Sequence, residues 1–235
     1  TAEGYAYESF FGYKTDGLFQ NQSDVETHVN AEGQLLQPSA RPGDIRFVDV
    51  NQDGVINEAD RTIIGNPTPA WTYGFNFRME YKGFDLVLFG QGVAGNEIYN
   101  ATRRFDLPKA NFTADALGRW TGEGTSYDFP RLNLMDGDPA GGNQNLTRSS
   151  DFWLQDGAFF RVKNLQVGYR LPSDLLGRAG IKSARVYFSA NNLMTFTAYK
   201  GFDPEIGAGA GVDKGIYPQP RFYLLGLNIT FGTNQ

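Results

Sequence analysis

The alternation of apolar and polar residues is clearest between residues 71 and 81. Apolar side chains fill the odd positions and polar or small residues fill the even ones: Trp71, Tyr73, Phe75, Phe77, Met79 and Tyr81 against Thr72, Gly74, Asn76, Arg78 and Glu80. A period of two over this length predicts a β-strand with one apolar and one polar face. Lys82 and Gly83 then separate it from a second strand expected over 84–93, which predicts a tight hairpin.

Four further segments are predicted to be strands, at about 5–13, 158–171, 184–196 and 220–231. Ser9 interrupts the apolar phase of the first segment. In the second, Arg161 and Lys163 share the parity of the apolar residues, and either a β-bulge or a strand that runs beyond the apolar layer would explain this. The high content of aromatic residues and glycine agrees with strands and turns, so the fold class is predicted to be all-β.

The connections between these six strands differ in length in a regular way. Long segments at about 15–70, 96–157 and 197–219 alternate with short ones at Lys82-Gly83 and roughly 172–183. Loops this long are expected to carry function or structure of their own, and a short helix is expected at 110–121. Short turns at one end of the strands and long loops at the other are typical of outer-membrane β-barrels, whose long loops lie outside the cell.

Six strands cannot close a transmembrane barrel, because even the narrowest barrels need about eight. We therefore expect residues 1–235 to form an antiparallel transmembrane β-barrel segment, with about six C-terminal strands of something larger, or to assemble with other chains. With a periplasmic C-terminus, the strand directions place all three long connections outside the cell. No run of the ~18 apolar residues of a membrane helix is present, and residues 1–13 do not resemble a signal peptide.

Composition excludes several functions. The net charge is −5, without the basic stripe of a nucleic-acid-binding protein. The chain has no cysteine, which excludes disulfides, thiolate catalysis and cysteine-based zinc sites. The single histidine, His28, lies in a polar segment, and the G-x-G-x-x-G match at residues 90–95 lacks the helix and βαβ unit of a dinucleotide site. We expect no catalytic residues and no enzyme activity.

The stretch DVNQDGVINEAD at residues 49–60 has the spacing of a calcium-binding loop. The expected oxygen ligands, with a backbone carbonyl at the residue after Gly54, are Asp49, Asn51, Asp53, Val55, Asn57 and Asp60. The last ligand is Asp rather than Glu, so its bidentate reach is shorter. An Asx-rich turn without an ion is the alternative. We favour a structural Ca²⁺ that orders part of an extracellular loop.

Several stretches, in order along the chain, resemble one family. They are GDIRFVDVNQDGVINEADRTIIGNPTPAWTYGFNFRMEYKGFDLVLFGQGVAGNEIYN at 43–100, FFRVKNLQVGYRLP at 159–172, ARVYFSANNLMTFTAYKGFDPE at 184–205 and PRFYLLGLNITF at 220–231. These stretches are similar to the barrel of SusC/RagA-type TonB-dependent outer-membrane transporters. Gly226, Ile229 and Phe231 also fit the last-strand signal of outer-membrane barrels, although residues 232–235 follow the aromatic position at which that signal ends.

The resemblance implies a multi-pass outer-membrane barrel of about 22 strands, surrounded by outer-membrane lipid, with a plug, powered through TonB and covered by a SusD-like surface lipoprotein. It implies import of a glycan, oligosaccharide or oligopeptide, with the plug, the TonB box and the N-terminal barrel strands outside these residues. The substrate-binding residues stay unknown at this point. The alternative is a secreted, calcium-stabilised β-sandwich binding module of the carbohydrate-binding kind.

Overall fold

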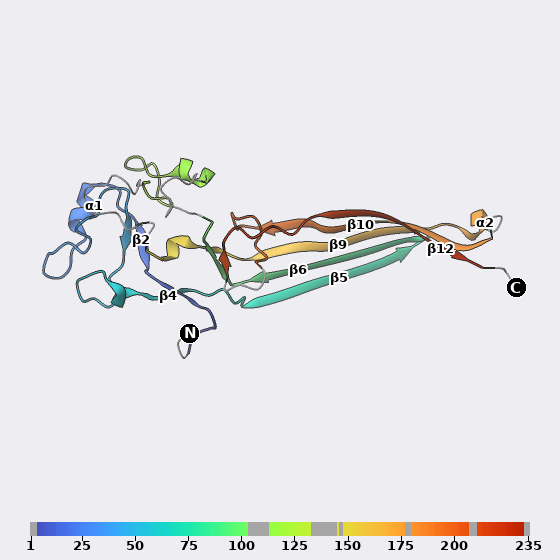
Figure 1. The fold of residues 1–235 in the computed structure, drawn as a ribbon, viewed down its shortest axis with the longest axis horizontal. Coiled ribbons are helices and arrows are strands. Elements are labelled where there is room, and N and C mark those ends of the chain that lie inside the picture. Colours follow the sequence, from blue (N-terminus) through green and yellow to red (C-terminus); the bar gives the residue numbers. More distant parts are fainter. Residues whose placement is uncertain are drawn as a thin grey trace. The chain divides into compact units, whose positions relative to one another are not determined.

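The computed structural model describes residues 4–102, 113–132, 145, 148–176, 180–206 and 211–232. The chain divides into two compact units (Figure 1). Unit 1 comprises residues 1–68, 97–155 and 209–215, and unit 2 comprises residues 69–96, 156–208 and 216–235.

Unit 2 is one antiparallel sheet of five long strands in the order β12-β10-β9-β6-β5. The strands are β5 Trp71–Tyr81, β6 Phe84–Ala94, β9 Phe159–Arg170, β10 Ile181–Thr197 and β12 Phe222–Phe231. Each pairs with the next long strand along the chain, so the sheet is an up-and-down meander (Figure 1). Five predicted strands are thereby confirmed. Within the described residues, the outer edges of β5 and β12 pair with no other strand.

Short and long connections leave the sheet at opposite ends, as the sequence predicts. At one end Lys82-Gly83 joins β5 to β6, and residues 171–180, which include the short helix α2 Ser173–Leu176, join β9 to β10. The long connections all leave from the other end, where the register pairs Trp71 with Ala94, Val93 with Phe159, and Phe159 with Thr197. The long loops therefore belong to one end of the sheet.

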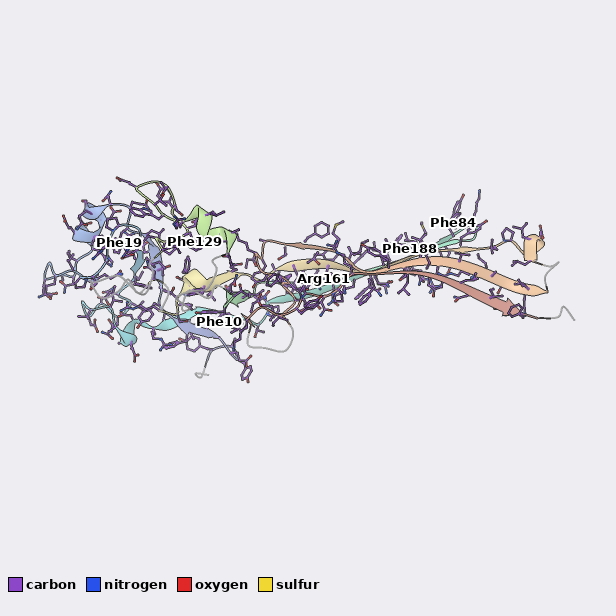
Figure 2. The ribbon with its side chains drawn as sticks, turned by 45° about the horizontal axis from the view of Figure 1, so that its top comes forward. Phe10, Phe19, Phe84, Phe129, Arg161 and Phe188 are labelled. Atoms are coloured by element: carbon purple, nitrogen blue, oxygen red, sulfur yellow. The ribbon has the colours of Figure 1, made fainter. Side chains whose placement is uncertain are left out.

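One face of this sheet is apolar across all five strands. The apolar phase of β5 continues from strand to strand in rows such as Met79, Leu86, Val167, Phe188 and Leu225, and Phe77, Leu88, Leu165, Ala190 and Tyr223. Many side chains of this face are open to the surroundings (Figure 2), and Leu225 is 81% exposed. Exposed apolar surface of this extent marks contact with lipid or protein. It does not favour a sandwich, in which this face would be covered.

A β-bulge in β9 changes the phase of the strand near the end with the long connections. Gly90 pairs with Val162 whereas its neighbour Phe89 pairs with Asn164, so Lys163 is the extra residue. An extra residue moves the following side chains to the opposite face of a strand. Of the two explanations for the parity of the charged residues in this strand, the bulge is confirmed.

Beyond the bulge, the side chains of Arg161 and Phe160 lie on opposite faces of β9. Arg161 pairs with Gln91 of β6 and Thr195 of β10, which continues the row of Gly74 on the polar face. The ring of Phe160 stays on the apolar face, where it stacks on Tyr73. The bulge therefore directs a guanidinium group to the polar side of the sheet.

The hairpin between β5 and β6 depends on its glycine. Lys82 and Gly83 both take a left-handed backbone, with φ 49° and 88°. Two such residues in a two-residue loop form the type I′ turn that matches strand twist. A Cβ atom at Gly83 would also lie 3.1 Å from the carbonyl oxygen of Arg170.

We expect Gly83→Ala to destabilise the sheet by about 1–2 kcal/mol, the cost of a left-handed conformation for a residue with a Cβ atom. Urea unfolding of the full-length protein in detergent micelles measures the change. Lys82→Asn is the matched control, because Asn tolerates this conformation, and it should leave stability unchanged or slightly raised. Equal losses in both variants would contradict the role of the glycine.

The strand predicted at 5–13 is wrong, and the helix predicted at 110–121 is only partly confirmed. The expected first strand at 5–13 does not join the sheet, so the sheet has five strands rather than six. A turn closed by the hydrogen bond from Ser9 to the Ala6 carbonyl, with Glu8 at φ 60°, breaks the extended backbone. Only β1 Phe10–Gly12 is a strand, in unit 1. Of the expected helix at 110–121, a 3₁₀ helix covers Ala114–Gly118, and residues 110–112 lie outside the described residues.

Within the described residues, unit 1 is built from short elements around two small cores. Its sheets pair β1 with β4 Thr62–Gly65, β2 Thr15–Leu18 with β3 Ile45–Phe47, and β7 Glu97–Asn100 with β8 Leu154–Asp156 and β11 Val212–Asp213. The helical elements are α1 Gln22–Thr27 and the 3₁₀ turns Glu58–Asp60, Ala114–Gly118 and Asp151–Trp153. One core contains Tyr13, Ile45, Phe47 and Ile56, and the other contains Ala116, Phe129 and Trp153.

Among the helices in the described residues, none is long and apolar enough to cross a membrane.

Candidate functional site

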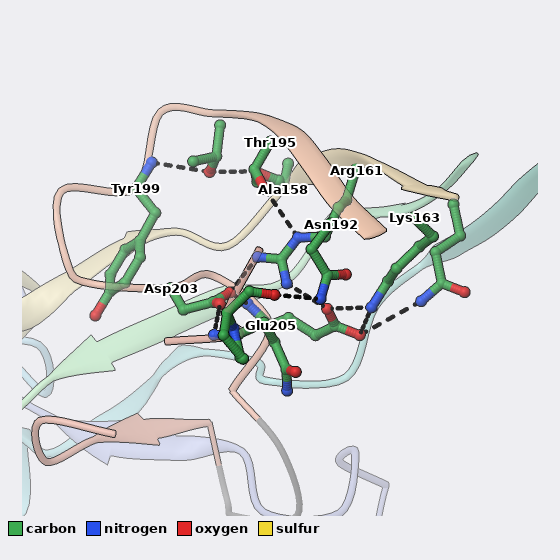
Figure 3. Close-up of polar contacts among 12 residues, drawn as sticks. Ala158, Arg161, Lys163, Asn192, Thr195, Tyr199, Asp203 and Glu205 are labelled. Carbon is green, nitrogen blue, oxygen red and sulfur yellow. Dashed lines mark hydrogen bonds and ion pairs between the residues drawn. The ribbon is translucent and has the colours of Figure 1, made fainter. Parts of the chain in front are cut away.

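A buried ion network lies on the polar face of the sheet, next to the bulge (Figure 3). Its centre is Arg161, whose side chain is only 3% exposed. The guanidinium donates from Nη2 to Asp203, from Nη1 to Glu205 at 2.8 Å and from Nε to the hydroxyl of Thr195 at 2.8 Å. Every nitrogen of this buried cation therefore has an acceptor, which is the condition under which a buried charge is tolerated.

Glu205 joins the network to two strands. Its carboxylate accepts hydrogen bonds from the Lys163 ammonium at 2.6 and 2.7 Å, in addition to the bond from Arg161. The side chain of Gln91, on β6, donates to the same carboxylate at 3.4 Å. The residue that the bulge adds to β9 is therefore the one that supplies a second cation for Glu205 (Figure 3).

Asp203 joins two parts of the connection between β10 and β12. One carboxylate oxygen accepts from Arg161 and from the backbone N–H of Glu205 at 2.9 Å, and the other accepts from the backbone N–H of Gln219 at 2.8 Å. Burial alone would raise the pKa of Asp203. The hydrogen bonds from Arg161, Gln219 and Glu205 outweigh burial, and the pKa lies below its usual range.

This lowered pKa gives the network a defined pH dependence. A carboxyl group whose folded-state pKa is below the ordinary value of about 3.9 contributes stability that is present above that value and lost as the pH falls through the folded-state value. We expect pepsin to cleave near Phe202 increasingly as the pH falls below about 4, because the connection loosens. In Asp203→Asn the cleavage should depend less on pH, and an unchanged pH profile would contradict the assignment.

A second charged group lies on the polar face toward the end with the short turns. Arg185 of β10 pairs with Asp85 of β6, with Nε to Oδ1 at 2.8 Å, and its Nη2 also donates to Gln166 at 3.1 Å. Arg78 and Glu80 form an exposed ion pair at 2.9 Å on β5. Arg78 and Glu80 alternate with the apolar residues of β5, so they lie on the polar face, as the sequence predicts.

The predicted calcium loop has a backbone folded by successive Asx turns. Asn51 and Asp53 each accept from a backbone N–H two residues ahead, at 3.0 Å, and Asn57 accepts from Ala59 at 2.7 Å. Gly54 has φ 84° and donates its N–H to Asp49 Oδ2 at 2.8 Å. The glycine at this position is therefore required by the turn, as the spacing predicts.

The two ends of the loop differ in what their carboxylates contact. Asp60 is fully buried and accepts from the N–H groups of Val50 at 2.9 Å and Asn57 at 2.7 Å. Asp49 Oδ1 is buried and has no hydrogen-bond partner, although Oδ2 of the same carboxylate is bonded. A buried carboxylate oxygen without a donor is costly unless a cation or a water molecule contacts it.

The six predicted ligands come from one continuous turn, but only three of them are carboxylates. Within the parts of the chain that the structure describes, no group of three or more His, Cys, Asp or Glu side chains is placed to hold a metal ion. Asn51, Asn57 and the carbonyl of Val55 supply the other predicted oxygens. The ligand set therefore stays a prediction, and the buried Asp49 oxygen is the observation in its favour.

The loop is attached to the core of unit 1 by one apolar and one cationic side chain. Ile56, within the loop, is buried in the first core. Arg148 donates to the Ile56 carbonyl at 3.3 Å, and its guanidinium lies 4.7 Å from the ring centroid of Tyr13 and 5.0 Å from that of Phe47. Burial lowers the pKa of Arg148. A change in the conformation of the loop is therefore expected to alter the packing of this core.

Sequence reasoning missed the residues of the ion network. Asp203 and Glu205 lie in the stretch FDPE, which belongs to the family resemblance, but the sequence alone assigns them no role. The parity of Arg161 and Lys163 was the one local signal, since it places two cations where a regular strand would place apolar residues. Of the aromatic residues in the 96–157 connection, Trp153 is buried and Tyr127 is exposed, and Phe105 lies outside the described residues.

Comparison with known proteins gives consistent matches over nearly the whole chain. TonB-dependent receptor P3 of Formosa agariphila is 38% identical over 97% of this chain and 22% of that protein. TonB-dependent receptor SusC of Bacteroides thetaiotaomicron is 28% identical over 97% of this chain and 20% of that protein. The solved structure of the RagAB peptide importer in its open-open state matches with a TM-score of 0.67 and 27% identity, over 95% of this chain and 22% of that chain. No protein-family profile matches the chain.

A five-stranded sheet with one apolar and one polar face, matched along its length by such receptors, is a segment of the wall of a transmembrane β-barrel. The chain belongs to the TonB-dependent receptors, which are outer-membrane proteins. Within this class it is of the SusC/RagA type. It spans about a fifth of the length of the curated relatives it matches.

Proposed function

We propose that the chain forms the C-terminal part of the barrel of a TonB-dependent importer, which carries a glycan, oligosaccharide or oligopeptide nutrient across the outer membrane. The observation that carries this proposal is the sheet itself: an exposed apolar face suited to lipid, and an opposite face with a neutralised ion network suited to a polar lumen. In this orientation the long connections lie outside the cell and the short turns and the C-terminus lie in the periplasm.

The proposed partners follow from the same family. A SusD-like surface lipoprotein would cover the outer mouth, and TonB would act on parts of the receptor that are not in this chain. The solved relative is the RagAB peptide importer. Whether this receptor takes peptides or glycans is decided by its own loops, so the experiment has to test both classes of nutrient.

A deletion strain tests this function. We expect loss of the full-length receptor to abolish growth on one class of nutrient, either oligosaccharides or oligopeptides, as the sole carbon source. The full-length gene should restore growth, and a gene without the β5–β6 hairpin, residues 71–94, should not. Receptor purified in detergent should carry a lipoprotein partner. Unchanged growth on both classes, or a receptor that stays in the soluble fraction, would refute the proposal.

Calcium is a second proposal, for the loop at residues 49–60. The ion would contact the unpartnered Asp49 oxygen and the carboxylate of Asp53, which is hydrogen-bonded only within the loop. Hydrogen bonds from Asn51 and Val55 lower the pKa of Asp53, so this group is ionised at neutral pH. Its role would be structural: the loop is joined to the unit 1 core through Ile56 and Arg148.

Replacing both Asp49 and Asp53 by Ala should remove one Ca²⁺ from the full-length receptor, because two charged ligands of one site are lost. Elemental analysis of the purified receptor measures the ion, and limited proteolysis between residues 49 and 60 measures the order of the loop. Asp16→Ala is the matched control, since Asp16 is exposed and pairs with Arg46 in the same unit. Unchanged metal content and proteolysis in the double variant would leave the loop an Asx-rich turn without an ion.

A further inference from the structure

The chain that follows β10 folds back onto the polar face of the sheet. Asp203 and Glu205, six and eight residues after the strand ends at Thr197, contact Arg161 and Lys163 of β9. Glu205 also reaches Gln91 of β6. The segment at residues 203–205 therefore lies against two strands of the polar face instead of continuing away from the strand ends (Figure 3).

The ion pairs between this segment and β9 lie within the strand and not at its end. β9 begins at Phe159, and the ion pairs are at the third and fifth residues of that strand. With a rise of about 3.3 Å per residue, this is on the order of 10 Å from the strand end. If the polar face lines the lumen, as the proposed function requires, the segment occupies the outer mouth of the barrel.

The same network fixes the segment at both sides of the connection. Asp203 binds the backbone N–H of Gln219, which lies shortly before β12, while its other oxygen is bound to Arg161. Arg161 and Asp203 are almost completely buried, at 3% and 6% exposure of their side chains. Removing one member of a buried pair leaves the other charge without compensation, at a cost of several kcal/mol. The segment is therefore held in place and does not swing freely.

The network leaves no net charge at this position. The two cations, Arg161 and Lys163, are matched by the two carboxylates, Asp203 and Glu205, so the sum is zero. An adjacent aromatic side chain, Phe202, remains 70% exposed on the fixed segment. A solute that passes this point therefore meets the bulk of the segment and an aromatic ring.

We propose that residues 202–206 form a fixed constriction in the outer mouth of the barrel, held by Arg161 and Lys163, which excludes bulky solutes by their size. This inference rests on the proposed function, because it needs the polar face to be the lumen. It assigns Arg161 and Lys163 as positioning residues for the specificity of import. They act through the segment and do not contact the cargo.

Cysteine labelling on intact cells tests the constriction, because this chain has no cysteine of its own. The full-length receptor with its partner would carry Phe202→Cys in a background without other reactive outer cysteines. We expect a small membrane-impermeant maleimide to label this position and a maleimide on a long polyethylene glycol chain to fail. Glu32→Cys, in an exposed turn of unit 1, should react with both reagents.

Releasing the segment should restore access. In the variant Asp203→Asn with Glu205→Gln, both charges on the segment are lost and the long reagent should label Phe202→Cys. Glu205→Gln alone is the milder variant if the double variant does not reach the membrane. Asp85→Asn is the matched control, since it breaks a carboxylate–arginine pair of the same face that holds no loop, and labelling should stay unchanged.

Two results would overturn the constriction while leaving the import function intact. One is equal labelling of Phe202→Cys and Glu32→Cys by the long reagent, which would place the segment outside the mouth. The other is continued exclusion of the long reagent in the released variants, which would show that the ion network does not hold the segment. Failure of the small reagent to label either position would instead contradict the placement of the long loops outside the cell.

Discussion

Receptor with Arg161→Met is expected to be less stable than the wild type by about 3–5 kcal/mol, the range measured when one partner of a buried ion pair is removed. Methionine retains most of the apolar stem, so packing changes little, but Asp203 would be left buried without its cation. Equilibrium urea unfolding in detergent micelles measures the loss. The unfolding midpoint should fall, and the slope with denaturant should stay the same.

Lys163→Met is the matched control for this variant. The side chains of Lys163 and Glu205 are 20% and 26% exposed, and Glu205 keeps its bond to Arg161 when the lysine is gone. A partly exposed pair of this kind contributes about 1 kcal/mol or less. Equal losses in the two variants would mean that the burial of Arg161 does not decide the stability of the network.

Phe77→Arg is expected to destabilise the full-length receptor in a bilayer by about 2–4 kcal/mol, the cost of a cation on the lipid side of a barrel near the midplane. Phe77 lies in the middle of β5 on the apolar face, and its ring is 40% exposed. The same substitution in a soluble protein with this face in water would cost little. The yield of folded receptor in the outer membrane, and its urea midpoint in lipid vesicles, measure the effect.

Asn76→Arg is the matched control. Asn76 is adjacent to Phe77 in the same strand but lies on the polar face, so the two variants compare the same cation on the two faces. A lumen-facing cation remains in contact with water, so the variant should retain nearly all of its stability. If Asn76→Arg costs as much as Phe77→Arg, or if neither has an effect, the apolar face does not contact lipid.

The long strands were predictable from the sequence because their signal is local. Alternation in 71–81 defines both the strand and its two faces, and the dipeptide at 82–83 defines the turn. The segment at 5–13 shows why alternation alone is insufficient. Its aromatic residues have the right period, but a short turn closed by Ser9 and Ala6 interrupts the extended backbone, and the sheet loses its sixth strand.

The ion network was not predictable in the same way. Arg161 and its two acidic partners are 42 and 44 residues apart, and no local pattern connects them. The bulge at Lys163 decides which face each cation takes, and a one-residue shift is visible in the sequence only as an unexpected parity. Only the pairing of β9 with β6 and β10 in the structure shows that these cations contact the segment that follows β10.

The loop at 49–60 lies between these two cases. Its turn is encoded by neighbouring residues, so the Asx turns and the left-handed Gly54 follow the predicted spacing. The burial of Asp60 and the unpartnered oxygen of Asp49 depend on packing against distant residues and could not be inferred from the spacing. Neither the local sequence nor the packing shows whether the loop binds Ca²⁺, which stays a prediction.

The open edges of β5 and β12 have a consequence for how such a barrel is assembled. Each edge presents a row of backbone donors and acceptors that, within the described residues, no strand satisfies. In hydrocarbon each unsatisfied group costs several kcal/mol, so this sheet would be unstable if it entered the bilayer by itself. Its five strands therefore have to be inserted together with the strands that complete both edges, which makes insertion and closure of the wall a single cooperative step.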